Sequence, residues 1–559
     1  MSSTPTLSAL NPDTDTYPLL TEEQIERVRL FACARTVAAG EVLYKPGDLA
    51  VSLFVLVSTC VEIVQPDAGG ERPVTVLLSK MFRGEAGMIG GQRAVVLARV
   101  LKVGEVLEVR PEDLLVLVAR DAQIGEIFLR AFILRRLMLI TRQLGNVLIV
   151  GSRHSANTTR LREFLGRNGH PYTYLDLDAD SASQALLDRF EIGISEIPIV
   201  ICNGQKVMRS PSTLEVADCL GLNDNLDDSL LRDVIIVGAG PADPAAAVYA
   251  ASEGLEPLLI ESYAPGGQAG SSFRIENYLG FPTGVSGQEL ALSAAAQALK
   301  FGAKMAVARA IVRLKCHRRP YELVMEHGGI LFARTIVIAT GACYKKPEVP
   351  RLRHFEGKGI HYGATYIEAQ FCLNEEVMVI GGGNSAGQAA VFLSQSASKV
   401  YMLVREDDLS QTMSRYLIQR IAGNPNIELL SNTELLELTG EDSLEEATWL
   451  NKATQEACSV RCRHVFIMTG AFPNTEWLRG CVSLDENGFI FTGRDLPLLP
   501  PQESSPPWPL KRPPQMFESS LPGVFAVGDV RAGSIKRVAS AVGEGAISVS
   551  LVHRALAEL

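Results

Sequence analysis

The chain has 559 residues, of which 47% are hydrophobic and 21% charged, a composition typical of soluble globular proteins. A net charge of −10 argues against broad nucleic-acid binding, which needs a basic surface. The sequence shows no signal peptide and no uncharged apolar run long enough to span a membrane. Its ten cysteines include no Cys-x-x-Cys pair, so we expect a cytoplasmic protein of three or four domains with reduced, mostly buried thiols.

The first segment, residues 1–145, is expected to form a β-roll with flanking helices. Short apolar runs such as FVLVS and RAVVLARV are separated by glycine turns, which is typical of antiparallel strands. The segment resembles a cyclic-nucleotide-binding domain. That resemblance implies Gly84 and Glu85 near the ribose and Arg93 at the cyclic phosphate of a bound cyclic nucleotide. The alternative is a regulatory or dimerising roll without a ligand.

Residues 146–228 alternate strands and helices and resemble a glutaredoxin or thioredoxin fold. The segment Ser155-Ala156-Asn157-Thr158 stands in the place of that family's Cys-Pro-x-Cys, and Ile197-Pro198 in the place of its cis-proline. Disulfide exchange requires a thiolate, so we interpret Ser155 as a helix N-cap. A docking or dimer-spacing role is favoured over a redox role.

Two glycine turns follow, each between a strand and a helix. The first, in DVIIVGAGPADPAAAVYA, contains Gly238 and Gly240, which would let the backbone approach a pyrophosphate at a helix N-terminus. Glu261, at the end of the next strand, can bind the adenosine ribose. The second turn, residues 381–386, repeats this pattern as GGGNSA. Asp243 occupies the third glycine position of the first turn, where its charge is expected to weaken the binding of a diphosphate.

With the strands ending in Thr-Gly and the motif GVFAVGDV, residues 229–559 resemble the low-molecular-weight thioredoxin reductases. The resemblance implies two interleaved Rossmann-like α/β domains, an FAD-binding domain (229–346 and 471–559) and an NAD(P)H-binding domain (347–470), in a homodimer. By motif, it implies these cofactor-binding residues: Gly238, Gly240, Pro241, Ala242, Glu261, Gly266, Gly267, Gln268, Asn277, Gly341, Gly381, Gly383, Asn384, Ser385, Ala386, Arg405, Gly528, Asp529, Arg537, Val538 and Ala539.

One expected feature of that family is missing. Where the family carries Cys-Ala-Thr-Cys, this chain has Gly363-Ala364-Thr365-Tyr366, so Gly363 and Tyr366 replace the cysteine pair. Cys372 is expected to be a core residue. No catalytic residue and no metal ligand is therefore assigned. We expect hydride transfer to FAD and electron transfer onward to an external small-molecule or protein acceptor.

The donor specificity is left open. The resemblance implies NADPH, but the segment that would bind its 2′-phosphate keeps only Arg405, followed by Glu406, and Arg415 lies further on. These local charges favour NADH, so a mixed or weak preference is expected. Two alternatives to a reductase with an unknown acceptor are ferredoxin–NADP reductase-like activity and a redox or nucleotide sensor with little turnover.

Overall fold

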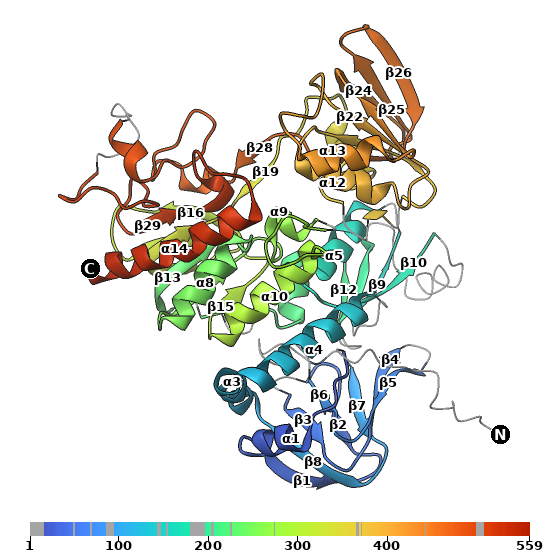
Figure 1. The fold of residues 1–559 in the computed structure, drawn as a ribbon, viewed down its shortest axis with the longest axis vertical. Coiled ribbons are helices and arrows are strands. Elements are labelled where there is room, and N and C mark those ends of the chain that lie inside the picture. Colours follow the sequence, from blue (N-terminus) through green and yellow to red (C-terminus); the bar gives the residue numbers. More distant parts are fainter. Residues whose placement is uncertain are drawn as a thin grey trace. The chain divides into compact units, whose positions relative to one another are not determined.

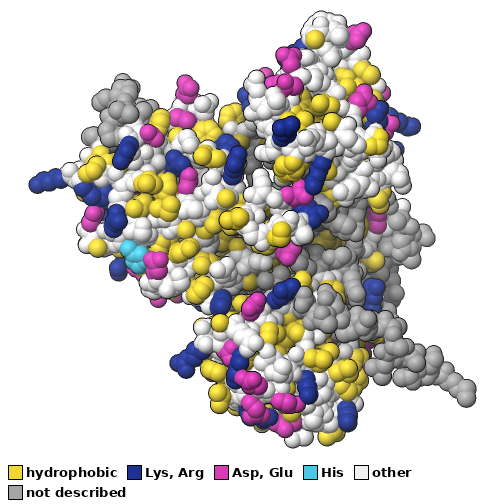
Figure 2. All heavy atoms as spheres, in the orientation of Figure 1, with side chains coloured by type: hydrophobic (Ala, Val, Ile, Leu, Met, Phe, Trp, Pro, Cys, Tyr) yellow, Lys and Arg dark blue, Asp and Glu magenta, His cyan; other side chains and the backbone are white. Residues whose placement is uncertain are grey.

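The computed structural model describes residues 16–48, 51–67, 70–84, 94, 96–141, 147–152, 155–178, 196–202, 206–223, 226–227, 229–272, 274–364, 368–369, 372–441, 443–498 and 508–558. The chain forms two compact units. The first contains Met1–Gly151, Asn168–Leu226 and Ala295–Ala306, and the second contains Ser152–Arg167, Asp227–Ala294 and Val307–Leu559. In Figure 2, acidic and basic side chains are interspersed over the face that is drawn.

The first unit begins with the predicted antiparallel roll. One of its sheets has the strand order β1-β8-β3-β6 and the other has the order β2-β7-β4-β5. Their bounds are β1 (Cys33–Val37), β2 (Val42–Tyr44), β3 (Leu53–Leu56), β4 (Val61–Asp67), β5 (Gly70–Leu77), β6 (Phe82–Arg83), β7 (Leu97–Val100) and β8 (Gly104–Val109). Helices α1 (Glu22–Arg29), α3 (Pro111–Arg120) and α4 (Ala122–Thr141) flank the roll, as expected (Figure 1).

A third sheet of the first unit has the order β10-β9-β11-β12. Strands β9 (Val147–Gly151) and β10 (Thr173–Asp176) are parallel, whereas β11 (Ile199–Cys202) runs antiparallel to β9 and to β12 (Lys206–Arg209). The Ile197–Pro198 peptide that precedes β11 is cis, as predicted. Helix α7 (Thr213–Cys219) follows β12 and is capped by Ser212, whose hydroxyl accepts from the Glu215 amide.

In the second unit, a sheet runs in the order β14-β13-β18-β17-β16, and β29 pairs with β18. The bounds are β13 (Leu231–Val237), β14 (Pro257–Ile260), β16 (Ile311–Lys315), β17 (Tyr321–Met325), β18 (Ile330–Ile338) and β29 (Val524–Ala526). Helices α8 (Ala242–Ser252) and α14 (Val538–Ala557) lie side by side (Figure 1). Their approach requires a glycine, because a Cβ at Gly545 would overlap the Ala242 carbonyl.

The segment that lies in sequence between β18 and β29 forms a parallel sheet with the order β20-β27-β21-β22-β23. The strands are β20 (Ile360–His361), β21 (Glu376–Ile380), β22 (Lys399–Leu403), β23 (Ile427–Leu430) and β27 (His464–Ile467). Alternate β21 residues enter different cores: Val377 and Val379 on one face, Met378 and Ile380 on the other. Helices α12 (Asn384–Leu393) and α13 (Arg415–Ala422) and a small sheet of β24 (Thr433–Thr439), β25 (Glu446–Asn451) and β26 (Glu456–Arg461) complete this part.

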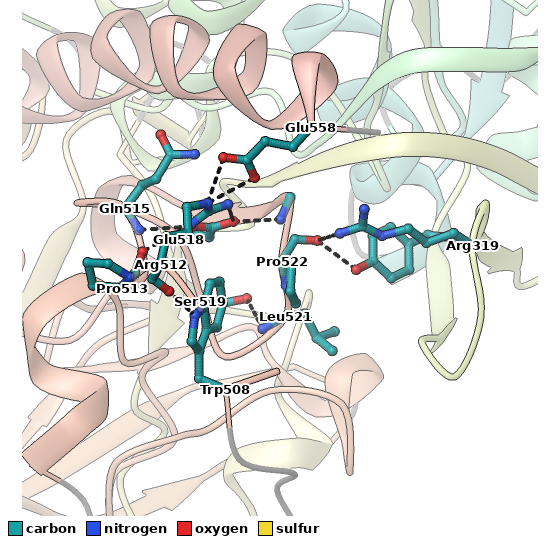
Figure 3. Close-up of polar contacts among 12 residues, drawn as sticks. Arg319, Trp508, Arg512, Pro513, Gln515, Glu518, Ser519, Leu521, Pro522 and Glu558 are labelled. Atoms are coloured by element: carbon teal, nitrogen blue, oxygen red, sulfur yellow. Dashed lines mark hydrogen bonds and ion pairs between the residues drawn. The ribbon is translucent and has the colours of Figure 1, made fainter. Parts of the chain in front are cut away.

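A buried ion pair holds the segment that leads into β29. Glu518 is fully buried and accepts hydrogen bonds from both terminal nitrogens of Arg512, at 2.7 and 3.0 Å, and from the Gly523 amide (Figure 3). Arg512 also contacts Glu558, just beyond the end of α14. Since β29 ends two residues before Gly528-Asp529, this cluster anchors the segment that carries those residues.

The prediction of reduced thiols is wrong for four cysteines. Disulfides join Cys202 to Cys219 and Cys316 to Cys481. The pairs are 17 and 165 residues apart and neither forms a recognisable motif, so spacing along the chain could not identify them. Over the described ranges, no helix is both long and apolar enough to cross a bilayer, and no group of three or more potential ligands could hold a metal ion.

Candidate functional site

A cavity of about 900 Å³ lies in the second unit, where the first glycine turn, α12 and the Gly528-Asp529 segment meet. The first turn is shaped by close backbone contacts. Gly238 has φ +122°, and a Cβ there would lie 2.7 Å from the Ala339 carbonyl oxygen. A Cβ at Gly267 would lie 2.9 Å from the Gly240 Cα. Larger residues at these two positions would displace the backbone that faces the cavity.

Most of the predicted cofactor-binding residues lie on the wall of this cavity: Gly238, Gly240, Pro241, Ala242, Glu261, Gly267, Gln268, Asn277, Gly341, Asn384, Ser385, Gly528, Asp529, Arg537 and Val538. The others are not part of its lining: Gly266, Gly381, Gly383, Ala386, Arg405 and Ala539. Gly381, whose Cβ would overlap the Met468 carbonyl, and Gly383, which precedes α12, shape the second turn instead. The structure therefore brings together segments that the sequence separates by nearly 300 residues.

Asp243 differs from its expected behaviour. Its carboxyl group is fully buried beside the first turn, with one oxygen 2.7 Å from the place of a Cβ on Gly238. Neither oxygen has a hydrogen bond of good geometry within the described residues, although the nearby backbone amides of Asp243 and Gly240 act to lower its pKa. Burial, and then the nearby Glu261, raise the pKa of Asp243 well above its usual range. The group is therefore favoured as a neutral acid, and the expected charge repulsion applies only above that raised pKa.

Glu261 ends β14 and is held in place by the Tyr263 amide, which donates to its carboxylate at 2.8 Å. Tyr263 also joins helix α5 (Ala156–Arg167), because its hydroxyl donates to the Arg160 carbonyl at 2.9 Å. Arg167 of the same helix donates to the Gly267 carbonyl at 2.6 Å. No pattern in the sequence indicated that α5 would lie on this wall.

Ser155 is interpreted as a helix N-cap. At the N-terminus of α5, the Thr158 amide donates to Ser155 Oγ at 3.4 Å, which agrees with that interpretation. Further along, Glu163 also lines the cavity. Burial, and then the nearby Glu368, raise the pKa of Glu163 to about 7, while Arg167 opposes the shift. The helix thus adds both a cation and a carboxyl group that titrates near neutrality.

At the other end of the cavity, Asp529 is partly buried. Burial raises the pKa of Asp529, and the Lys536 ammonium opposes that shift. Gln268 bridges the neighbouring wall by donating to the Ala342 carbonyl at 2.5 Å. Arg537 precedes α14 and so places the start of that helix at the cavity.

Comparison with known proteins identifies the family to which this chain belongs. The model described as pyridine nucleotide-disulphide oxidoreductase matches residues 232–545. The chain belongs to this family. A second model, described as a cyclic nucleotide-binding domain, matches residues 34–121. The family implies binding of FAD and NADPH, and the chain is an FAD-dependent pyridine-nucleotide oxidoreductase of the thioredoxin-reductase-like type.

Individual relatives cover the same region. The thioredoxin reductase of Dictyostelium discoideum is 32% identical over 337 residues, which are 59% of this chain and 98% of that protein. That of Treponema pallidum is 34% identical, over 56% of this chain and 94% of that protein. The crystal structure of the Lactococcus lactis thioredoxin reductase in its FR conformation has a TM-score of 0.52 and 28% identity, and covers 59% of this chain and 100% of that one. These findings confirm the predicted multidomain fold, with its β-rich N-terminal domain and Rossmann-like domains.

The segment that replaces the expected cysteine pair begins on the cavity wall. Gly363 lines the cavity, and a Cβ there would lie 3.1 Å from the Ser271 Cβ. Tyr366 lies outside the described residues. Cys372 is fully buried, as predicted. One exposed thiol that sequence reasoning missed, Cys343, also lines the cavity, and its place directly after the Thr-Gly-Ala motif could have signalled it.

A histidine pair lies beside this segment. His361 Nε2 is 3.1 Å from His464 Nδ1, and the His361 ring stacks on Phe466. Burial, and then His464, lower the pKa of His361 to about 3. His361 is therefore a neutral imidazole at physiological pH and does not supply a positive charge to the cavity.

At the second glycine turn, Glu406 lies close to Gly382, in the segment expected to decide between NADH and NADPH. A Cβ on Gly382 would lie 3.5 Å from Glu406 Oε2. Thr412 Oγ1 donates to the Gly382 carbonyl at 2.7 Å. Arg405 and Arg415 are both exposed to solvent.

In the cyclic nucleotide-binding domain, Gly84 contacts helix α4. A Cβ at Gly84 would lie 2.5 Å from the Phe132 ring, and Arg135 donates to the Gly84 carbonyl at 3.2 Å. Glu85 and Arg93, predicted for the same nucleotide, lie outside the described residues. Gly84 thus has a packing reason to be glycine, whatever its role toward a ligand.

Proposed function

We propose that this protein is an FAD-dependent NAD(P)H oxidoreductase that passes electrons from flavin to an external acceptor without an internal dithiol. The main support is the position of Gly363. It lies on the cavity wall at the start of the segment where thioredoxin reductases, by the resemblance, carry their cysteine pair. Glycine cannot exchange with a disulfide, so that route is closed.

The residues present fit FAD. The first glycine turn and the start of α8 would hold the diphosphate, where backbone amides and the helix dipole favour an anion. Glu261 would accept hydrogen bonds from the adenosine ribose and Asp529 from the ribityl chain. When bound, FAD supplies two-electron redox chemistry.

The residues at the second glycine turn fit a nicotinamide dinucleotide. Asn384 and Ser385 begin α12 on the cavity wall, so the helix N-terminus would face the diphosphate. Glu406 beside Gly382 suits a ribose 2′-hydroxyl better than a 2′-phosphate, since two anions would repel. We therefore propose weak discrimination between NADH and NADPH.

An absorbance experiment tests the proposal. The purified protein should show flavin bands near 370 and 450 nm that bleach on anaerobic addition of NADPH or NADH. Ferricyanide and quinones should then be reduced, whereas thioredoxin with a disulfide dye should not. A colourless protein that FAD cannot reconstitute, or a thousandfold preference for NADPH in kcat/KM, would contradict it.

The second candidate function is that of a sensor. It is favoured by one observation, the burial of Asp243 at the first glycine turn, because this acid would weaken the retention of the cofactor as it ionises. Bound FAD with negligible turnover on every acceptor would select it. Stoichiometric reduction of a ferredoxin would instead select ferredoxin–NADP reductase-like activity. A cytoplasmic location and a homodimer stay predictions.

We also propose that the N-terminal domain binds a cyclic nucleotide, which the family match supports. Isothermal titration with cAMP and with cGMP tests this directly. Heat from either one supports a ligand-gated domain, whereas silence with both selects the ligand-free roll.

A further inference from the structure

A second cavity, of about 620 Å³, lies beside the disulfide between Cys316 and Cys481 in the second unit. Cys316 directly follows β16. Cys481 follows the 3-10 helix Glu476–Leu478 and lines the cavity. Neither cysteine takes part in the proposed flavin chemistry.

The lining of this cavity is strongly basic. It contains four permanently charged side chains, Arg313, Lys315, Arg318 and Arg479, together with His317. One carboxylate, Glu322, is also present. The positive charge therefore exceeds the negative charge severalfold, and a cavity of one sign concentrates oppositely charged solutes.

Two of the four cations, Lys315 and Arg318, form ion pairs with Glu322, whereas Arg313 and Arg479 do not. Glu322 is buried, with one oxygen 2.7 Å from Lys315 Nζ and the other 2.8 Å from Arg318 Nη2. Within the described ranges, no ion pair or side-chain hydrogen bond involves Arg313 or Arg479. These two guanidinium groups remain available to an anionic ligand.

The two sulfurs differ in their surroundings. Cys481 is buried on the cavity wall, with its sulfur 3.3 Å from the Leu314 carbonyl oxygen. Cys316 is half-buried and is not itself part of the lining, so its sulfur meets the cavity only through the bond to Cys481. The net positive charge of the cavity beside the disulfide favours a thiolate over a thiol, and a stabilised thiolate is the better leaving group in disulfide exchange.

We infer that this disulfide and the basic cavity beside it form a thiol–disulfide exchange site for a small acidic thiol, one that carries carboxylates. The thiolate of the first molecule attacks the Cys481 sulfur, forms a mixed disulfide with it and expels the Cys316 thiolate, which takes a proton from water. A second molecule attacks the mixed disulfide at the sulfur of the bound thiol and releases Cys481. Two thiols are oxidised to one disulfide, and the protein disulfide is reduced to two thiols.

The observations favour a small thiol over a protein. The cavity volume falls in the range of small-molecule sites, and Cys481, which lines the cavity, is only 4% exposed. A cysteine on a flat protein surface would not reach it. The inference goes beyond the proposed reductase activity and does not depend on bound flavin.

The first experiment uses the full-length protein, purified aerobically, with peptide mapping under non-reducing conditions to identify the Cys316–Cys481 crosslink. The oxidised protein is then treated with glutathione, which is acidic, 2-mercaptoethanol, which is neutral, or cysteamine, which is cationic, at matched thiolate concentrations. Quenching with iodoacetamide and mass spectrometry give the rate of opening. The expected order is glutathione, then 2-mercaptoethanol, then cysteamine, with at least about tenfold between the first and the last.

The same samples contain an internal control, the disulfide between Cys202 and Cys219, which has Asp218 next to one of its cysteines. Its opening should not favour the acidic thiol. Replacing Arg313 and Arg479 with Gln should remove most of the preference for the acidic thiol at the Cys316–Cys481 disulfide. Salt at 0.5 M should have the same effect. Arg463→Gln, which changes an exposed arginine of the predicted NAD(P)H-binding domain, should leave the preference unchanged. Free thiols at Cys316 and Cys481 in the aerobic protein, or equal rates with all three reductants, would overturn the inference.

Discussion

Asp243 is a buried acid beside the first glycine turn, and we expect its carboxyl group to influence dinucleotide binding there. We predict that Asp243→Gly tightens FAD binding by about tenfold at pH 8, since it removes a buried carboxyl group whose ionised form would repel the diphosphate. The isosteric Asp243→Asn separates charge from shape, because it removes the ionisation alone. Fluorescence titration with FAD measures both variants. Unchanged affinity in both would refute the role of this acid.

The same group predicts a pH dependence of stability. Its pKa is raised in the folded state, so between the ordinary aspartate range and that raised pKa the folded protein binds more protons than the unfolded one. Stability from this group is therefore present at low pH and declines as the pH rises. Asp243→Asn should raise Tm more at pH 8 than at pH 5, by scanning fluorimetry. An equal gain at both pH values would argue against ionisation.

Donor choice is also decided at the residue scale. Replacing Glu406 with Gln should shift the ratio of kcat/KM for NADPH over NADH upward by about fivefold, the effect of removing about 1 kcal/mol of screened charge repulsion. Asp407→Asn is the matched control, because Asp407 is an exposed acid next in sequence. Steady-state kinetics with both donors would show the role to be absent if the two variants behaved alike.

At the scale of elements, the segment before β29 depends on one buried ion pair. Arg512→Ala would leave the carboxylate of Glu518 buried without its cation, so we predict a loss of about 3–5 kcal/mol in the free energy of unfolding. Glu558→Ala removes only the exposed contact of the same arginine and should cost less than about 1 kcal/mol. Urea unfolding of both variants measures the difference. Similar losses would mean that burial does not set the energetics here.

The elements themselves were largely predictable, because local patterns specify them. The apolar runs that end at the glycines at 238 and 381 identified strands and turns, and Ser155 was recognisable as a cap. The pairing of Cys316 with Cys481 and the contact of Arg512 with Glu558 depend on distant segments that no local pattern joins. Asp243 was noticed in the sequence, but its protonation follows from burial, which only the folded structure provides.

At the scale of the whole molecule, the route of electrons follows from what stands at Gly363. The double substitution Gly363→Cys with Tyr366→Cys should introduce thioredoxin-coupled turnover that the natural protein lacks, measured by reduction of a disulfide dye. Ser271 must shift by a few tenths of an ångström to admit the new side chain. Gly363→Cys alone is the control, since one thiol cannot form the internal disulfide. Thioredoxin-coupled turnover in the unmodified protein would contradict the proposal.

Helix α5 limits how this protein can be divided in the laboratory. Its residues belong in sequence to the predicted 146–228 segment, yet Arg167 holds the Gly267 carbonyl and Arg160 accepts from Tyr263. A gene truncated at residue 229 would encode every motif of the reductase family and still lack these contacts. Such a fragment would be an incomplete flavoprotein rather than a minimal one. The 146–228 segment and the reductase-like segment therefore cannot be treated as independent modules. Exchanging either one for a homologue would also require replacing the contacts that α5 makes with Tyr263 and Gly267.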